Sequence, residues 1–329
     1  MRMTRPIFVG LLVSAVAVIG GISFWQSRDP GPREDEPARL YGAPSTPPAW
    51  AAKEIPSDDN AVSFFVIGDQ GFQNDAKRAV AKAMCDLVPR ARPDFALTVG
   101  DNFYLNGVKS VEDDLWHTHF EQAFREDCLN IPFYAALGNH DHNGNIQAQV
   151  EYTAFSSRWR MPSSYYAFSS VIEKGVSLEI FVLDTQPIRH EDRVSDSQLR
   201  WLEDKLERST AHWKIVVGHH PIVSNGVHGG SSTVARRVRP LFERYDVDLY
   251  LAGHDHDLQL LRTGSKWLQV VSGAGSAPRS TSWKDDTIYA AAEPGFAWIS
   301  AGRDDIWIQF VTAKDGATYI HRIEKPVQQ

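Results

Sequence analysis

Residues 98–104 read Thr98-Val99-Gly100-Asp101-Asn102-Phe103-Tyr104, an apolar run that reaches a glycine and then turns polar. Four other segments have the same form, and each apolar run has the length of a buried strand. They are Val66-Ile67-Gly68-Asp69, Ala136-Leu137-Gly138-Asn139-His140-Asp141, Val216-Val217-Gly218-His219-His220 and Leu251-Ala252-Gly253-His254-Asp255-His256. Ligands of open α/β sheets bind at the carboxyl ends of the strands, so these five ends predict one crevice.

The side chains at these strand ends are carboxylate, phenol, amide and imidazole, a set suited to two neighbouring metal ions. Each motif is weak alone, because Gly-Asp after a strand is usually a turn. The pair His254 and His256 is a stronger indication of a metal site, since residues i and i+2 of an extended segment point the same way. Because five such steps occur in order, we expect a two-metal site, which would carry out in-line displacement at phosphorus.

Strand and helix patterns alternate between Val62 and His256, after which the pattern is all-strand. We expect strands at 62–67, 95–99, 133–137, 178–183, 212–217, 247–251, 258–261, 267–271, 296–300, 306–311 and 317–323. We expect helices at 75–87, 111–125, 145–159, 196–208 and 233–245, with Ser195 as the N-cap of the fourth. The predicted fold class is α/β, a four-layer αββα sandwich of two mixed sheets, in one catalytic domain over residues 58–329.

The N-terminal residues form a second signal. Arg2 and Arg5 precede an uncharged stretch from Pro6 to Trp25, which approaches the length of a bilayer span. A cleaved signal peptide and an uncleaved membrane anchor both fit residues 1–26, and either would export the rest of the chain to the periplasm or outside the cell. Residues 27–57 are rich in proline and charge, so we expect an extended linker there.

The chain has two cysteines, Cys85 and Cys128. In an exported protein they could form a disulfide, or they could be two separate buried thiols, and the sequence leaves both alternatives open. The net charge of -7 argues against nonspecific nucleic-acid binding, which needs a basic surface. It does not argue against phosphate esters, because a buried metal pair can reverse the local field.

The strand-end residues and their order resemble the metallophosphoesterase superfamily of calcineurin-like phosphoesterases. The resemblance is closer still to the purple, tartrate-resistant acid phosphatases of low molecular mass. It covers roughly Ser63 to Leu260, and its most specific parts are 100–104, where a tyrosine follows the aspartate by three, and 138–142. Arg158-Trp159 and the segment 161–166 also resemble that subgroup.

The resemblance implies two metal sites. The ligands implied for iron(III) are Asp69, Asp101, Tyr104 and His256. The ligands implied for a divalent ion (iron, zinc or manganese) are Asp101, Asn139, His219 and His254, with Asp101 bridging. His140 and His228 match the outer histidines that contact phosphate and leaving group in such enzymes, so they join Asp101 as the expected catalytic residues. His220 stands at a position of the substrate rim where the mammalian members usually have tyrosine, so this chain departs from their pattern there.

The activity that the resemblance implies is hydrolysis of phosphomonoesters by attack of a metal-bound hydroxide. Two other functions stay open: a phosphodiesterase acting on nucleotides or phospholipids, and a metal-bound surface protein without turnover. We expect a monomer whose partner is a phosphate monoester, with membrane contact only through residues 6–25. Histidines 117, 119, 190, 212 and 321 are expected to lie outside the site, while His142 is close to it in sequence.

Overall fold

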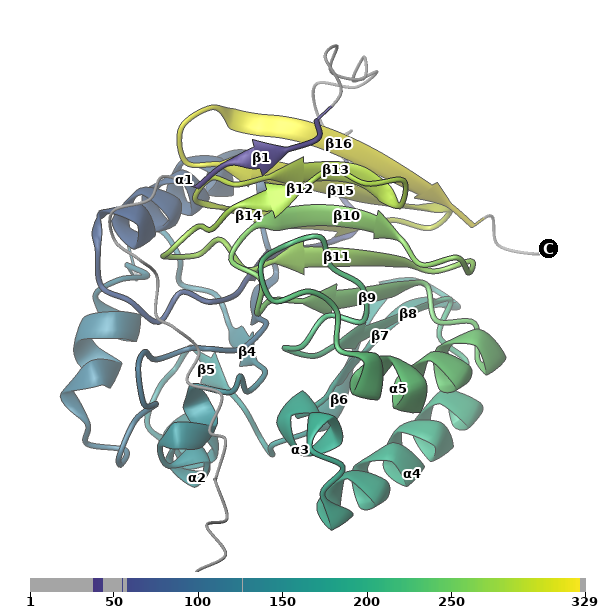
Figure 1. Cartoon of the computed structure of the whole chain (residues 1–329), viewed down its shortest axis with the longest axis horizontal. Helices are drawn as coiled ribbons and strands as arrows, with labels where there is room; N and C mark the ends of the chain where they lie inside the picture. Colours follow the sequence, from purple (N-terminus) through teal and green to yellow (C-terminus); the bar gives the residue numbers. More distant parts are fainter. Residues whose placement is uncertain (1–37, 44–54, 56–57, 126, 326–329) are drawn as a thin grey trace, which may run out of the picture. The chain divides into compact units, whose positions relative to one another are not determined.

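Two seven-stranded mixed sheets are the framework of the computed structural model, which describes residues 38–43, 55, 58–125 and 127–325 (Figure 1). The predicted leader over 1–26 and most of the predicted linker over 27–57 lie outside these residues. None of the helices that the structure describes combines the length and apolar composition needed to span a bilayer.

The first sheet joins the N-terminal half of the fold to the C-terminal strands. Its strand order is β16 (Gly316–Glu324), β15 (Asp305–Thr312), β14 (Gly295–Ala301), β2 (Val62–Ile67), β3 (Phe95–Thr98), β4 (Phe133–Ala135) and β5 (Trp159–Arg160). Strands β2 to β5 are parallel and the other pairs antiparallel. All six residues of β2 are buried, as expected of a strand covered on both faces.

The second sheet has the same mixed character. Its strand order is β13 (Thr287–Ala291), β10 (Leu258–Arg262), β11 (Leu268–Ser272), β9 (Leu249–Ala252), β8 (Trp213–Val217), β7 (Val176–Val182) and β6 (Tyr166–Glu173). Strands β7, β8, β9 and β11 are parallel neighbours. A separate two-stranded sheet pairs β1 (Leu40–Tyr41) with β12 (Thr281–Ser282).

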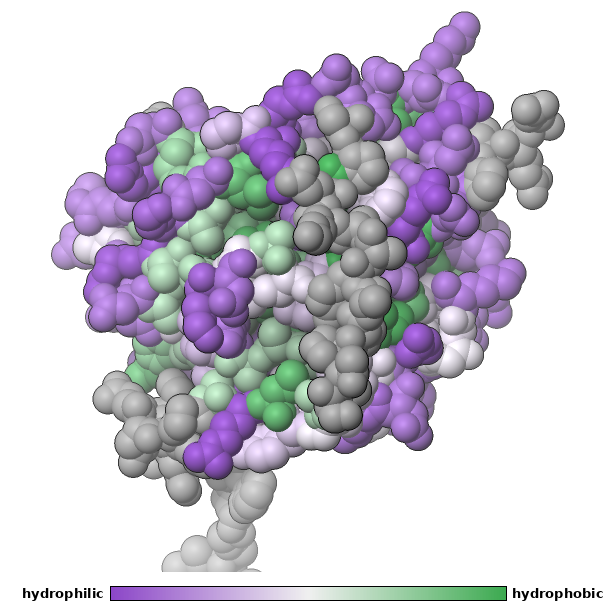
Figure 2. All heavy atoms as spheres, turned by 90° about the horizontal axis from the view of Figure 1, so that it is seen from above, coloured by the Kyte–Doolittle hydropathy of each residue, from purple (hydrophilic) through white to green (hydrophobic). Residues whose placement is uncertain are grey.

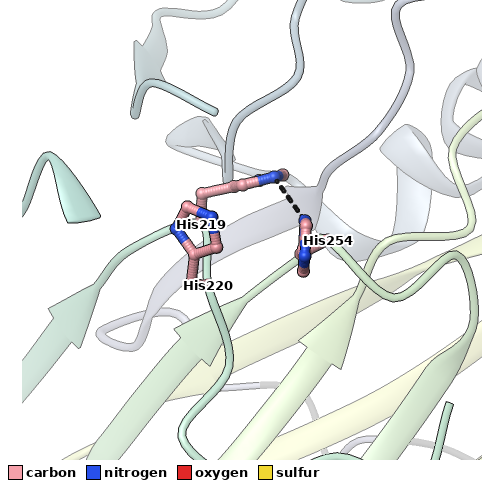
Figure 3. Close-up of side chains that lie close together, drawn as sticks. All are labelled: His219, His220 and His254. Carbon is pink, nitrogen blue, oxygen red and sulfur yellow. Dashed lines mark hydrogen bonds between the residues drawn. The ribbon is translucent and has the colours of Figure 1, made fainter. Parts of the chain in front are cut away.

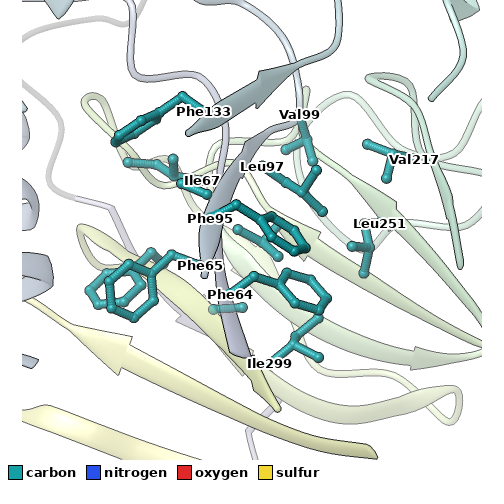
Figure 4. Close-up of a cluster of buried hydrophobic side chains, with 14 of the residues drawn as sticks. Phe64, Phe65, Ile67, Phe95, Leu97, Val99, Phe133, Val217, Leu251 and Ile299 are labelled. Carbon is teal, nitrogen blue, oxygen red and sulfur yellow. The ribbon is translucent and has the colours of Figure 1, made fainter. Parts of the chain in front are cut away.

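The two sheets pack face to face around one core (Figure 4). Phe64 and Leu97 of the first sheet and Val217 and Leu251 of the second belong to the same cluster of buried side chains. Alternate residues of a strand point to opposite faces, so Val216 and Tyr250 lie on the other side of the second sheet, in a second cluster.

Helices form the two outer layers. Helix α1 (Asp75–Ala91) packs on the first sheet, and helices α4 (Arg193–Arg208) and α5 (Ser232–Arg244) pack on the second sheet. The shorter helices are α2 (Ile146–Glu151), α3 (Thr185–Arg189), η1 (Trp116–Glu121), η2 (Asp141–Asn143) and η3 (Tyr152–Ala154). Hydrophilic residues form most of the outline of the face in Figure 2, with hydrophobic ones visible between them, as on most protein surfaces. The predicted four-layer αββα sandwich is confirmed.

Several predicted elements are wrong in extent or type. The helix expected over 111–125 is only the π-helical η1, although Trp116, Phe120 and Phe124 are all buried. The chain turns before it because the Asp113 carboxylate accepts hydrogen bonds from the backbone N–H groups of Lys109, at 2.8 Å, and Leu115, at 3.0 Å. Such side-chain bonds compete with helix formation.

Other differences concern ends and omissions. The helix expected over 145–159 stops at α2 and η3, and β5 begins at Trp159. Ser195 is not an N-cap, because α4 starts two residues earlier and Ser195 is buried in its first turn. Strands β6 and β13 and helix α3 were not predicted. In β6 buried and exposed residues do not alternate strictly, and the strand is not buried along its whole length.

Cys85 and Cys128 form a disulfide, with their Cα atoms 5.4 Å apart. The bridge connects α1 to the segment that leads into β4 and closes a loop of sequence separation 43. Of the two alternatives left open by the sequence, the structure therefore contains the bridge.

Replacing both cysteines by alanine should lower the free energy of unfolding by about 2 to 4 kcal/mol, because a cross-link over a loop of this length restricts the unfolded chain. Chemical denaturation of the double variant and of the oxidised protein measures the difference. Reduced wild-type protein is the matched control and should lose a similar amount. Equal stability of all three samples would contradict a stabilising bridge.

Candidate metal centre

Five loops meet at one edge of the two packed sheets. They follow the carboxyl ends of β2, β3, β4, β8 and β9, the strands that carry the five sequence motifs. Backbone hydrogen bonds join neighbouring loops: Asp69 N donates to Gly100 O at 3.0 Å, and Gly253 N donates to His219 O at 3.0 Å. The loops are therefore held to one another, as the strand order of parallel sheets allows.

A first group of donor atoms consists of Asp69, Tyr104 and His256. The Tyr104 hydroxyl donates to Asp69 Oδ1 at 3.0 Å and lies 3.0 Å from His256 Nε2. His256 Nε2 is in turn 3.4 Å from Asp69 Oδ1. Two oxygen atoms and one nitrogen atom that could bind a metal ion thus lie within 3.4 Å of one another.

A second group consists of Asp101, Asn139, His219 and His254. His219 Nε2 lies 3.1 Å from Asn139 Oδ1, 3.2 Å from His254 Nδ1 and 3.5 Å from Asp101 Oδ1. Figure 3 shows the approach of His219 and His254.

The two groups are adjacent. Asp69, Asp101 and His219 each offer a ligand atom within 4.8 Å of the others. All seven residues that the sequence singled out as metal ligands are therefore brought together, with both aspartates near one another between the groups.

The electrostatics of the cluster fit bound cations. Burial raises the pKa of the Asp69 carboxyl well above its usual range, and the charge of Asp101 adds to this shift. Burial, followed by the charges of Asp101 and Asp69, also raises the pKa of Tyr104. Buried carboxylates and phenolates are costly without compensating charge, and metal ions at these positions would provide it.

Carbonyl groups fix the orientation of two of the imidazoles. His219 Nδ1 donates to Val99 O at 2.9 Å, and His256 Nδ1 donates to Ala277 O at 2.7 Å. These bonds leave Nε2 of each ring as the lone-pair nitrogen that faces the cluster, the arrangement usual for metal-binding histidines.

The backbone of the site is strained at three of its donor residues. Asp69, Asp101 and His254 have φ values of 55°, 52° and 70°, a region that non-glycine residues rarely occupy. Hydrogen bonds hold them there: His254 N donates to Asp69 Oδ2 at 2.8 Å, and His140 N donates to Asp101 Oδ1 at 2.9 Å. Such strain is found mainly at functional sites.

The two outer histidines lie against the cluster on different sides. The His140 ring is 4.6 Å from that of Tyr104, and its Nδ1 donates to Leu105 O at 2.7 Å. The His228 ring is 4.6 Å from that of His254. Both side chains are partly exposed, so both can be reached from solvent.

His220 is not at a substrate rim, as the sequence suggested, because it is fully buried. Its Nδ1 pairs with Thr185 Oγ1 at 2.8 Å, and its ring is 4.7 Å from that of His254. His219, His220 and His254 offer nitrogen atoms within 4.8 Å of one another, so an ion held by the other two would have this imidazole close by (Figure 3). His142 instead pairs with the Asp184 carboxylate at 2.9 Å.

Sequence reasoning missed three residues that organise the site. The Asp141 carboxylate accepts from Gly138 N at 2.8 Å and Asn102 N at 3.1 Å, which ties the β4 loop to the β3 loop. Asp255 accepts from His228 N at 2.7 Å. The side chain of Arg279 contacts the His228 ring. Asp141 and Asp255 could have been found from the sequence, because they lie within the 138–141 and 253–256 motifs. No motif in the sequence around Arg279 indicates a role in the site.

An α/β sandwich with carboxylate, phenol, amide and imidazole side chains clustered at its strand ends is the arrangement expected of a metal-dependent phosphoesterase. The family model of calcineurin-like phosphoesterases matches residues 62–258. The chain belongs to this family.

Similar proteins agree with that assignment. Human tartrate-resistant acid phosphatase type 5 is 36% identical over 238 residues, which cover 66% of this chain and 73% of that protein. Purple acid phosphatase 3 of Arabidopsis thaliana is 32% identical over 69% of this chain and 65% of its own length. A solved structure of Plasmodium GAP50, an anchor in the inner membrane complex, superposes with a TM-score of 0.75 at 24% identity, covering 82% of this chain and 90% of that one.

Gly138→Ala should displace Asp101 and lower metal affinity or activity roughly 10- to 100-fold, the range seen when groups that support metal ligands are lost. A Cβ at Gly138 would lie 2.1 Å from Asp101 Oδ1 and 2.3 Å from Asp101 N, so the loop must move. Metal titration of the purified, metal-free protein measures the effect. Gly302→Ala is the matched control, because its Cβ comes no closer than 3.1 Å to any atom, the nearest being the flexible end of Asp58. Unchanged affinity in Gly138→Ala would contradict this role.

Proposed function

We propose that the chain is a binuclear-metal acid phosphatase that hydrolyses phosphomonoesters. The observation that supports this most directly is the meeting of seven donor side chains, from five separate loops, in two adjacent groups. The similarity to tartrate-resistant and purple acid phosphatases supports the same activity. The substrate would be a phosphate ester bound over the two groups.

The chemistry of each group favours a different ion. The oxygen-rich group would hold a hard ion, iron(III), through Asp69, Asp101, Tyr104 and His256. The second group would hold a divalent ion, iron, zinc or manganese, through Asp101, Asn139, His219 and His254. Asp101 would bridge the two, in keeping with its place beside both Asp69 and His219.

When bound, two neighbouring ions supply Lewis acidity and an activated water for in-line displacement at phosphorus. The chain positions the substrate around them. His140 Nε2 lies 4.0 Å from Asp101 Oδ2, and His228 packs on the His254 ring, so these imidazoles flank the proposed substrate position. There they would contact the phosphate oxygens and the leaving group.

We also propose export of the chain. The disulfide between Cys85 and Cys128 is typical of oxidising compartments outside the cytosol. Residues 1–26 would direct export as a signal peptide or an anchor, residues 27–57 would be a linker, and residues 58–329 the catalytic domain.

Asp101→Asn and His219→Ala should each reduce hydrolysis of an aryl phosphate monoester by a factor on the order of 10² to 10³, since each removes a group on which charge stabilisation of the transition state depends. Turnover at mildly acidic pH with metal-loaded protein measures this. Asp304→Asn, an exposed carboxylate, is the control and should be fully active. Metal-loaded wild type without turnover would contradict an enzyme, and faster turnover of a bis-aryl phosphate would indicate a phosphodiesterase.

Tyr104→Phe tests the iron assignment. A phenolate bound to iron(III) absorbs visible light, so the concentrated wild-type protein should be coloured and Tyr104→Phe should be bleached while it still contains iron. A visible spectrum together with metal analysis measures both. Tyr289→Phe, whose hydroxyl pairs with Thr318 Oγ1, is the control and should keep the colour. A colourless wild type with both positions filled would overturn iron in favour of zinc or manganese.

A further inference from the structure

Arg279 lies beside the proposed substrate position. It follows β11 in the segment Gly273-Ala274-Gly275-Ser276-Ala277-Pro278-Arg279, which lies against the site because Ser276 Oγ donates to Asp69 O and Ala277 O accepts from His256 Nδ1. Its Nη1 donates to His228 Nε2, and the His228 ring is 4.6 Å from that of His254 and 6.5 Å from that of His256. The guanidinium thus contacts an imidazole that itself lies beside both proposed metal-binding groups.

Both members of this pair are fixed to the same short segment, 254–256. The backbone N–H of Arg279 donates to His256 O at 2.7 Å, and His256 Nδ1 donates back to Ala277 O at 2.7 Å. On the other side, the Asp255 carboxylate accepts from His228 N at 2.7 Å and Gly229 N at 3.1 Å. These hydrogen bonds hold Arg279 and His228 beside the two histidines of that segment, which are proposed to bind metal.

Arg279 is a permanent cation at the edge of the site, in contact with the ring of His228. The Arg279 side chain is also partly exposed, so an incoming anion can reach it. A guanidinium donates only, which makes His228 Nε2 the acceptor of their hydrogen bond. A phosphate oxygen is a stronger acceptor than a neutral imidazole and would take over that N–H.

We propose that Arg279 binds a non-bridging oxygen of the substrate phosphate and thereby selects monoesters over diesters. This inference rests on the proposed function of the site. A monoester has three unesterified oxygens, so two of them can bind the metal ions while the third presents its charge to Arg279. A diester has only two, and it would leave the guanidinium without its anionic partner at the moment when His228 contacts the leaving group.

The test compares Arg279→Gln and Arg279→Lys with wild type on mono-aryl and bis-aryl phosphate. For Arg279→Gln we expect the kcat/KM of the monoester to fall about 10- to 100-fold, and the monoester-to-diester ratio of kcat/KM to fall at least tenfold, as for loss of a charge-assisted bond of about 1.5 to 3 kcal/mol. Arg279→Lys should restore part of the ratio. Arg303→Gln, whose partner Glu173 is at the surface, is the matched control and should leave the ratio unchanged.

A general structural defect would lower both activities together, so an unchanged ratio in Arg279→Gln overturns the proposal. Titration of metal-loaded protein with inorganic phosphate tests the same contact without turnover. Weaker phosphate binding by Arg279→Gln, at unchanged metal content, supports the proposal even if wild type hydrolyses neither ester, an outcome that would contradict the phosphatase function alone. Equal phosphate affinity in the two proteins would overturn the role of Arg279.

Discussion

The burial of Asp69, Asp101 and Tyr104 within reach of one another is the constraint on which the rest of the site depends. Asp69 is fully buried, Asp101 is 1% exposed, and Tyr104 donates to Asp69. Acidic groups in such a place repel one another and lose their hydration, so burying them costs stability unless cations compensate. The fold tolerates them because five loops hold them around two positions where metal ions would restore the balance of charge.

Holding that arrangement requires backbone conformations that the chain would otherwise avoid. The positive φ angles at Asp69, Asp101 and His254 turn each chain sharply at the end of its strand, so that the side chain faces the cluster. Each of these turns follows a glycine, and at Gly138 even a methyl group would collide with Asp101. Strained backbone and close approach thus both occur at the strand ends that carry the site, while the sheets carry the apolar core.

Much of this could be predicted from the sequence because the decisive signals are local. Each motif couples a buried strand to a polar turn, and β2 was predicted to the residue. The disulfide could not be predicted, since it depends on a distance that no local pattern contains. The helix expected over 111–125 is wrong in extent because the Asp113 carboxylate bonds to backbone N–H groups and turns the chain before η1 begins. Arg279 was missed for a different reason: it reaches the site from 23 residues beyond His256, in a loop without any metal-binding motif.

These differences separate two kinds of residue in the site. The proposed metal ligands follow parallel strands, whose order fixes where they meet, so local sequence is enough to find them. Two of the groups expected to contact substrate, His228 and Arg279, lie in connecting loops and are held by hydrogen bonds to the segment 254–256. Substrate preference can therefore change within one fold while the metal-binding groups stay constant, as long as those bonds to Asp255 and His256 persist. The same fold also occurs in a Plasmodium anchor protein, so the sandwich alone does not determine function, and the activity of this chain depends on the side chains at its strand ends.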